Sequence, residues 1–259
     1  MDSSSLALLA LAALFAGFVD AVVGGGGLIQ IPALFSVLPG EAPATLFGTN
    51  KSASVFGTTS AAFHYARRVR IPWRTTLPAA LAAFLFSYVG AAAVAWLPRE
   101  LLRPLILALL VGAAVYTFRR KDFGALHRPA HAGGRELVFA LLLGSVIGFY
   151  DGFFGPGTGS FLIFLFIRYF GFDFLHASAA AKVVNVATNL AALAYFVPHG
   201  NVLPLAALVM AVFNVAGAQA GSRLALRHGS GFVRVVFLCV AALLILRFAW
   251  DSYGGVLSR

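Results

Sequence analysis

The sequence has few charged residues and almost no cysteine. Only 11% of its 259 residues are charged, whereas a soluble domain carries about 25%. The single cysteine, Cys239, lies inside an apolar run, so no disulfide can form within one chain and nothing indicates a cysteine-based metal site. Neither of its glycine runs ends in the Gly-Lys-Ser/Thr of a phosphate-binding loop. The sequence therefore predicts neither a disulfide-stabilised secreted domain nor a nucleotide-driven pump.

Long apolar runs fill the sequence instead. Hydrophobic residues make up 60% of it, and the mean hydropathy is +0.89. Runs of roughly 20 apolar residues recur from end to end, which is typical of a polytopic helical membrane protein. They are longer and more uniform than the alternating strands, each of about 10 residues, of an outer-membrane barrel. We therefore predict an all-α polytopic membrane protein, with the lipid bilayer as a partner. Its first span, 6–23, lacks the basic start of a signal peptide and is expected to be retained.

One unit occurs twice in this sequence. The stretch GFVDAVVGGGGLIQIP at 17–32 returns 131 positions later as GFYDGFFGPGTGSFLI at 148–163. We therefore predict one repeat at 1–118 and a second at 136–259, joined by a basic linker at 119–135. The offset aligns, without a gap, Gly17 with Gly148, Asp20 with Asp151, Gly24 with Gly155, Gly26 with Gly157, Lys51 with Lys182, Gly90 with Gly221, and Arg103 with Arg234.

Each repeat is predicted to contain about five helical segments. The second segment of each is short, because about 12 residues reach only ~18 Å as a helix, whereas the hydrocarbon core is ~30 Å thick. These two segments are predicted to be half-helices, either re-entrant or continuing a helix broken at the glycines, with Pro32 and Pro156 near the breaks. The predicted segments are 6–23, 27–38, 43–65, 75–96 and 104–118, then 136–154, 158–171, 174–197, 203–222 and 233–250.

The distribution of basic residues predicts the orientation in the membrane. The loop 66–74 holds four arginines, whereas the equivalent loop 197–205 holds no lysine or arginine. The positive-inside rule places 66–74, the linker 119–135 and the loop 223–234 in the cytoplasm. Equivalent loops then lie on opposite sides, so we predict that the two repeats are inverted and that both termini are extracytoplasmic. This topology accounts for the net charge of +10, and we expect no nucleic-acid partner.

Four charged residues, Asp20, Lys51, Asp151 and Lys182, lie deep within predicted spans. A charge at the bilayer centre costs at least ~2.5 kcal/mol, so all four are expected to face protein or water. In a structural interpretation, each aspartate caps a broken helix, and each lysine pairs with the aspartate of its own repeat. In a functional interpretation, both lysines face a central cavity and hold an anion, and both aspartates are candidates for carrying a coupling proton.

The glycine motifs and the third segments supply hydrogen-bond donors. A half-helix that begins near Leu28, or near Gly159, would point free N–H groups and the positive end of its dipole into the protein. Lys182, Asn185 and Asn189 are spaced i, i+3 and i+7, so they share one helix face. Glycine for close packing and interhelical hydrogen bonding are the structural alternatives. The candidate substrate-binding residues are Gly24, Gly25, Gly26, Gly27, Asn50, Lys51, Ser52, Gly155, Gly157, Thr158, Gly159, Lys182, Asn185 and Asn189.

The paired motifs resemble a known family. GFVDAVVGGGG followed by GTNKSASVFGT, and GFYDGFFGPGTGSF followed by AKVVNVATNLAAL, are similar to the motifs of the TauE/SafE family of sulfite-exporter-like membrane transporters. The resemblance covers nearly the whole chain. It implies a bacterial inner-membrane transporter of small sulfur-containing anions, with Asn50, Lys51, Lys182 and Asn185 at the site. The second copy departs from the first at Ala181, which aligns with Asn50, and at Pro156, which aligns with Gly25.

The sequence therefore predicts a secondary transporter that exports small sulfur-containing oxyanions, such as sulfite or organosulfonates, by alternating access at a midplane site. An anion-selective channel, or a transporter of another small anion such as a carboxylate, would use the same donors. An intramembrane enzyme with Ser160 as nucleophile and His176 as base lacks any familiar hydrolase motif, so we expect no enzymatic activity. We expect no cofactor and no metal, and the sequence leaves the oligomeric state open, a homodimer included.

Overall fold

The computed structural model of the protein describes residues 2–94, 127 and 133–257. Within those ranges every regular element is a helix, so the all-α prediction is confirmed. The predicted segment 104–118 and most of the linker 119–135 lie outside the described residues. The helices are α1 (Ser3–Val23), α2 (Gly27–Val37), α3 (Pro43–Ala66), α4 (Trp73–Ala93), α6 (Gly134–Phe153), α7 (Thr158–Phe170), α8 (Phe174–Phe196) and α9 (Pro204–Leu257).

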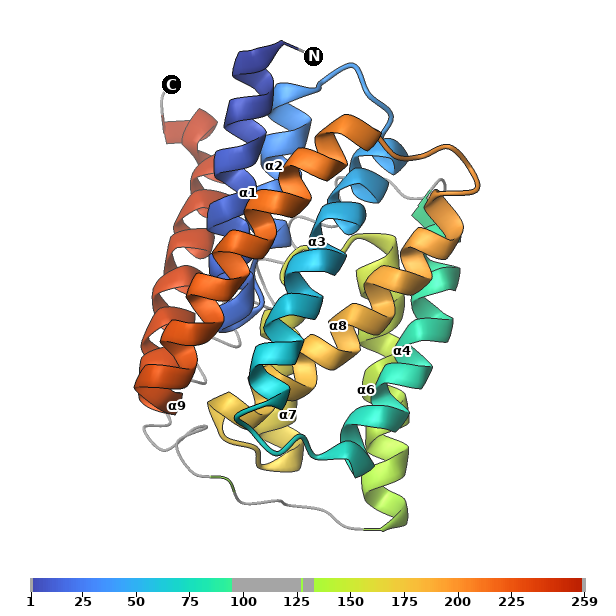
Figure 1. The fold of residues 1–259 in the computed structure, drawn as a ribbon, viewed down its shortest axis with the longest axis vertical. Coiled ribbons are helices and arrows are strands. Elements are labelled where there is room, and N and C mark those ends of the chain that lie inside the picture. Colours follow the sequence, from blue (N-terminus) through green and yellow to red (C-terminus); the bar gives the residue numbers. More distant parts are fainter. Residues whose placement is uncertain (1, 95–126, 128–132, 258–259) are drawn as a thin grey trace.

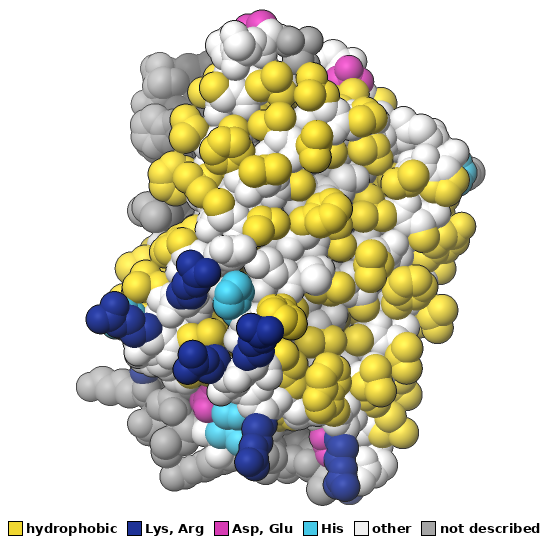
Figure 2. Space-filling view, viewed as in Figure 1, with side chains coloured by type: hydrophobic (Ala, Val, Ile, Leu, Met, Phe, Trp, Pro, Cys, Tyr) yellow, Lys and Arg dark blue, Asp and Glu magenta, His cyan; other side chains and the backbone are white. Residues whose placement is uncertain are grey.

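Five of the described helices are long and apolar enough to cross a bilayer, namely α1, α4, α6, α8 and the Pro204–Cys239 part of α9. Their outer faces carry large exposed hydrophobic side chains, such as Leu8, Phe15, Leu85 and Val146. Figure 2 shows hydrophobic side chains over most of one face, with lysine and arginine gathered toward its lower end. So much exposed apolar surface is expected of a polytopic membrane protein, because the outer faces of its helices contact lipid.

The second helix of each repeat is too short to cross the membrane. α2 has 11 residues and α7 has 13, so they reach roughly 16–20 Å. Each begins inside its glycine motif, at Gly27 and at Thr158, where the predicted segments 27–38 and 158–171 begin. The first glycine of each motif turns the chain, because Gly24 has φ of 78° and Gly155 has φ of 87°, a region in which side chains are strained. The predicted break at the glycine motifs is therefore confirmed.

α9 consists of two helical arms joined at Gly229. The backbone leaves helical geometry there, with φ of 76° and ψ of −171°. In Figure 1 the orange arm runs down to this region and the red arm returns toward the C-terminus. The predicted loop at 223–234 is therefore wrong in extent, because one glycine makes the turn and the flanking residues stay helical.

The helix boundaries repeat at the offset found in the sequence. Helices α1, α2, α3 and α4 begin at residues 3, 27, 43 and 73, and α6, α7, α8 and α9 each begin 131 residues after their counterparts. In Figure 1, α1 starts at the upper end beside the N-terminus, whereas α6 starts at the lower end. Equivalent helices thus run in opposite directions, which the predicted inverted arrangement requires.

The two repeats pack chiefly on each other. α1 lies against α9, and α4 lies against α6. A Cβ on Gly17 would lie 2.2 Å from the Asn214 carbonyl oxygen, and a Cβ on Gly148 would lie 2.5 Å from the Ala83 carbonyl oxygen. Because Gly17 aligns with Gly148 and Ala83 aligns with Asn214 at the same offset, this is one contact made twice. The halves therefore fold around each other, with glycine where the backbones touch.

The contact between α1 and α9 also supplies a test of this packing. A Cβ on Gly217 would lie 1.9 Å from the Leu14 carbonyl oxygen, whereas a Cβ on Gly231 in the same helix meets nothing within 4 Å. We expect Gly217→Ala to lower the free energy of unfolding by about 1–3 kcal/mol, since overpacking forces the backbones apart. Thermal unfolding in detergent micelles measures this, with Gly231→Ala as the control. Equal stability of the two variants would contradict the packing.

Candidate functional site

A small polar cavity lies where both repeats meet at the centre of the molecule. Its volume is about 30 Å³, which is room for one or two water molecules. Both glycine motifs and the central helices α3 and α8 contribute to its wall. The lining residues are Asp20, Gly24, Gly27, Asn50, Lys51, Ser54, Thr58, Asp151, Gly155, Thr158, Gly159, Asn185 and Asn189.

Most of the predicted binding residues line this cavity, and both candidate proton carriers, Asp20 and Asp151, line it as well. Five of the predicted binding residues do not. Lys182 reaches it only through Asp20, with which it pairs. Ser52 follows Lys51 directly on α3, so it points about 100° away around the helix axis. The predicted binding residues that are not in the lining are Gly25, Gly26, Ser52, Gly157 and Lys182.

The sequence analysis missed two lining residues, Ser54 and Thr58. They follow Lys51 at i+3 and i+7, so they share its helix face. They also lie 131 residues before Asn185 and Asn189, which were predicted. The offset between the repeats would therefore have identified both of them.

Two buried ion pairs cross between the repeats. The Lys51 Nζ lies 2.5 Å from Asp151 Oδ2, and the Lys182 Nζ lies 3.0 Å from Asp20 Oδ2. The lysine side chains are 4% and 0% exposed. The two pairs are equivalent under the repeat offset, so they form one interaction made twice. All four charges face protein, as their cost in a bilayer requires.

Both parts of the structural interpretation need correction. We expected each lysine to pair with the aspartate of its own repeat, but each pairs with the aspartate of the other, because the repeats pack on each other. We also expected the aspartates to cap the broken helices. In the described part of the chain, Asp20 Oδ2 instead accepts from Lys182 and, at 3.3 Å, from the Thr58 hydroxyl. The charges therefore hold the two repeats together at the cavity.

The backbone donors of the half-helices are fewer than expected. In α2, the Leu28 N–H donates to the Gly25 carbonyl oxygen at 3.1 Å. In α7, the Ser160 N–H donates to the Gly24 carbonyl oxygen at 3.2 Å, which joins the two motifs. In the part of the chain that the structure describes, the N–H groups of Gly27 and Gly159 donate to no backbone carbonyl oxygen, and both glycines line the cavity. These two remain as backbone donors for a ligand.

Close packing explains at least three of the motif glycines, namely Gly24, Gly26 and Gly159. A Cβ on Gly24 would lie 2.2 Å from the Gly159 carbonyl carbon, and a Cβ on Gly26 would lie 2.8 Å from the Asp20 Cβ. A Cβ on Gly159 would lie 2.4 Å from the Gly24 Cα, so the packing alternative accounts for Gly24, Gly26 and Gly159. Gly155 lies against an ion pair, since its Cβ would come within 3.2 Å of the Lys51 Nζ. Glycine at these positions lets the two broken helices and the charges approach one another.

Two buried amides in the cavity have unpaired oxygens. The Oδ1 atoms of Asn50 and Asn185 make no hydrogen bond among the described residues, although the side chains are only 4% and 6% exposed. An unsatisfied buried polar atom costs about 1–3 kcal/mol. An amide can also turn over to present its NH₂ group in place of the oxygen. These amides are therefore suited to a polar ligand or water in the cavity.

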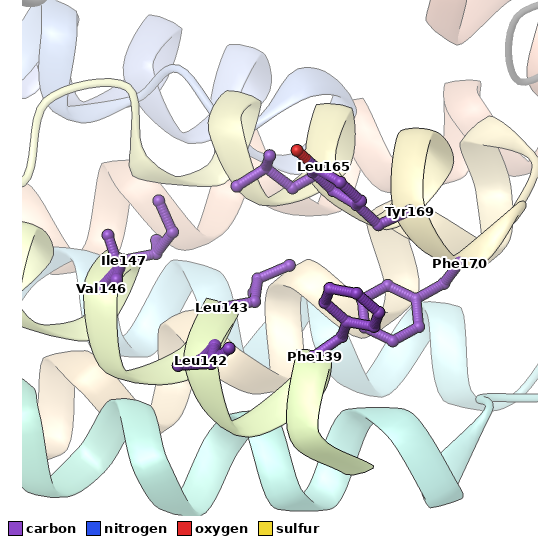
Figure 3. A pocket seen from close by; sticks show the side chains of 8 residues that line it. All are labelled: Phe139, Leu142, Leu143, Val146, Ile147, Leu165, Tyr169 and Phe170. Carbon is purple, nitrogen blue, oxygen red and sulfur yellow. The ribbon is translucent and has the colours of Figure 1, made fainter. Parts of the chain in front are cut away.

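A larger groove elsewhere has the wrong chemistry for an anion. It has a volume of about 290 Å³ and lies between α6 and α7. Figure 3 shows hydrocarbon side chains from both helices around it, including Leu143, Ile147 and Leu165. The Tyr169 hydroxyl is the only polar side-chain group among its lining residues. On a surface that faces lipid, this groove is suited to acyl chains.

The residues considered for an enzyme do not form a catalytic pair. The Ser160 hydroxyl donates to the Val23 carbonyl oxygen at 2.7 Å, which fastens α7 to the end of α1. The His176 Nδ1 instead lies 2.9 Å from Asp173 Oδ2 at the start of α8. Ser160 and His176 thus have separate structural partners.

Three side chains of kinds that can bind a metal ion lie together at the start of α8. The ligand atoms of His127, Asp173 and His176 lie within 4.8 Å of one another. Asp173 caps α8 by accepting from the His176 N–H at 2.8 Å, and the His127 ring stacks on the His176 ring at 4.0 Å. Burial and the neighbouring His176 lower the pKa of His127, which favours a neutral stacked ring. We assign this cluster a helix-capping role.

Comparison with known proteins agrees with the architecture. A sequence model of the family described as "Sulfite exporter TauE/SafE" matches residues 9–248. "Probable membrane transporter protein ORF9" of Sinorhizobium sp is 37% identical over 246 residues, 95% of this chain and 93% of that protein. "Probable membrane transporter protein YfcA" of Escherichia coli K12 is 34% identical over 249 residues, 96% of this chain and 91% of that protein. No solved structure matches the chain.

The crossed pairing can be measured by unfolding. Lys51→Met should lower the free energy of unfolding by roughly 3–5 kcal/mol, because it leaves Asp151 buried without a partner. Adding Asp151→Asn should restore most of that loss, whereas adding Asp20→Asn should lower stability further. Chemical unfolding in micelles distinguishes the two double variants. Rescue by Asp20→Asn in place of Asp151→Asn would show that the pairs form within each repeat.

Proposed function

Because the chain belongs to the sulfite exporter TauE/SafE family of membrane transporters, we propose that it is a secondary transporter that exports small sulfur-containing oxyanions, such as sulfite or organosulfonates, across a bacterial inner membrane. The observation that carries this proposal is the donor-rich cavity between the repeats. An oxyanion presents several acceptor oxygens, and the cavity offers a lysine ammonium, amide and hydroxyl groups, and two backbone N–H groups.

Each class of donor comes from a different part of the fold. Lys51 supplies the charge that the cavity wall presents directly, and Lys182 stands behind Asp20. Asn185 and Asn189 from α8 line the cavity together with the equivalent residues of α3, Ser54 and Thr58. Gly27 and Gly159 add N–H groups at the positive ends of the α2 and α7 dipoles. Donors from both repeats would therefore surround the same anion.

The size and the position of this cavity support alternating access. About 30 Å³ accommodates water but not sulfite, so we expect the cavity to widen when an anion binds. Loading requires the repeats to separate at their shared boundary. The bonds from Ser160 to the end of α1 join α7 to the other repeat and would open in such a motion. Rocking of one repeat against the other about a central site is the usual design of transporters built from inverted repeats.

The arginine-rich end is proposed to face the cytoplasm. Arg67, Arg68, Arg70 and Arg74 lie at the turn between α3 and α4, which Figure 1 places at the lower end with the start of α6. Both chain ends are marked at the opposite end of the molecule. The positive-inside rule then gives extracytoplasmic termini and a cytoplasmic linker. No nucleotide site is expected, so the gradient of the anion or of a coupled ion provides the driving force.

Anion flux into vesicles that contain the purified protein tests the proposed site. Lys51→Met and Lys182→Met should each reduce sulfite flux about 10-fold or more, since a lost charge-assisted hydrogen bond costs about 1.5–3 kcal/mol. Ser52→Ala is the matched control, because Ser52 lies next to Lys51 but outside the cavity lining, and its flux should stay at the wild-type level. Unchanged flux in both lysine variants would remove the site assignment.

The same vesicles distinguish the alternatives. Counterflow, in which unlabelled anion on one side accelerates uptake of labelled anion, indicates a carrier, and large unitary currents indicate a channel. Sulfite, thiosulfate, methanesulfonate and acetate compared in parallel identify the substrate class. Preference for acetate would contradict the sulfur-oxyanion proposal while leaving the transporter assignment intact.

A further inference from the structure

The charges around the cavity already cancel one another. Asp20 and Asp151 bring two negative charges, and Lys51 and Lys182 bring two positive charges. The other titratable groups against the two aspartates in the described part of the chain are phenols from α3 and α6. The Tyr65 hydroxyl donates to the Ala21 carbonyl oxygen at 3.0 Å, and the Tyr150 hydroxyl donates to the Pro156 carbonyl oxygen at 2.6 Å. The buried site is therefore neutral before any ligand enters.

An anion alone cannot enter this neutral site at low cost. An added anion would leave a net negative charge in a buried space, and an unpaired buried ion costs several kcal/mol. If the anion took Lys51 from Asp151, the carboxylate would become the unpaired ion. A proton on that carboxylate removes the charge, and it replaces a lost ion pair with a neutral acid that needs a hydrogen-bond acceptor.

The cavity offers acceptors of the required kind. The Oδ1 atoms of Asn50 and Asn185 have no hydrogen-bond partner among the described residues, and both side chains line the same cavity as the two aspartates. A protonated Asp20 or Asp151 has an O–H to donate to such an oxygen. Each such bond would satisfy one amide oxygen that has no partner in the ion-paired state. Charge balance and the unpaired amides are independent observations, and both favour a protonated aspartate when an anion is bound.

We propose that the transported anion replaces an aspartate as the partner of a lysine, that the released aspartate takes up a proton, and that the protein therefore carries its anion together with one proton per negative charge. This proposal rests on the oxyanion transport proposed above. Lys51 and Asp151 exchange first, because both line the cavity, whereas Lys182 is reached only through Asp20. The second pair serves the second charge of a dianion.

This coupling makes both forms of the protein electrically balanced at the site. The empty form carries two ion pairs. The loaded form carries two lysines with a dianion and two protonated acids, or with a monoanion, one protonated acid and one ionised aspartate. Transport is then insensitive to membrane potential and sensitive to the pH difference. An anion that accumulates in the cytoplasm leaves down its own concentration gradient, with its protons, and an acidic exterior opposes that export. No covalent step is involved, and the proton returns to water when the anion is released.

Calorimetric titration of the purified protein in two buffers of different ionisation enthalpy counts the protons taken up on binding. The probes are methanesulfonate, which carries one negative charge, and sulfite at a pH well above its own second pKa, where it carries two. The expected uptake is about one proton for methanesulfonate and about two for sulfite. With one coupled proton, affinity for methanesulfonate should fall about tenfold for each unit rise in pH.

Variants assign the protons to residues. Either substitution leaves the empty site with one extra positive charge, so Asp151→Asn and Asp20→Asn should each abolish the proton uptake with methanesulfonate and reduce the uptake with sulfite from two to one. Glu41→Gln removes an exposed carboxylate between α2 and α3 and should change neither count.

The possible results are distinct. Binding of either anion by the wild-type protein without proton uptake overturns the coupling and leaves oxyanion transport standing. Binding of neither anion overturns both proposals. The wild-type count alone decides the coupling if the asparagine variants do not fold.

Discussion

The structure depends on the cost of burying charge. Asp20, Asp151 and Lys182 lie within helices that are long and apolar enough to cross a bilayer, and Lys51 lies within α3. A charge in such surroundings is stable only with a partner of opposite sign. Pairing Lys51 with Asp151 and Lys182 with Asp20 places those partners on opposite repeats. The charges therefore do more than neutralise one another, because they fix how the two halves meet. The same requirement makes the site responsive to any anion that competes for a lysine.

Close backbone contact is the second requirement. Glycine stands at 17 and 148 and at 90 and 221, where a Cβ would lie 2.2 to 2.5 Å from a backbone atom of the other repeat. The broken helices meet in the same way at Gly24 and Gly159. These contacts occur in equivalent pairs, so the same contact between helices is made twice in one chain. A single chain thereby encloses a polar cavity of about 30 Å³ within an apolar bundle.

Much of this architecture could be predicted from the sequence, because it follows from local patterns. Periodicity and the repeat predict the starts of α2 and α7 within the glycine motifs and the starts of α3 and α8. They also predict the polar face with Lys182 and Asn185. Ser54 and Thr58 were also accessible through the offset of 131 residues. Local pattern therefore determined which residues face the centre.

The partners of those residues depend on tertiary contacts and could not be read from local pattern. The sequence allows each lysine to pair with either aspartate, and the packing of the two repeats on each other decides between them. The Ser160 N–H bond to Gly24 occupies a donor that the glycine motif alone would leave free. The sequence predicts a reversal within 223–234, but it does not indicate that Gly229 alone leaves helical geometry while its neighbours stay helical.

A structure determined with selenite, a heavier analogue of sulfite, tests the central claim most directly, because the anomalous scattering of selenium locates the anion. The account predicts a selenium peak among Lys51, Asn185 and Gly159, with the Lys51 ammonium withdrawn from Asp151. Selenium found only at the surface arginines, with both lysine–aspartate pairs intact at saturating selenite, would contradict it.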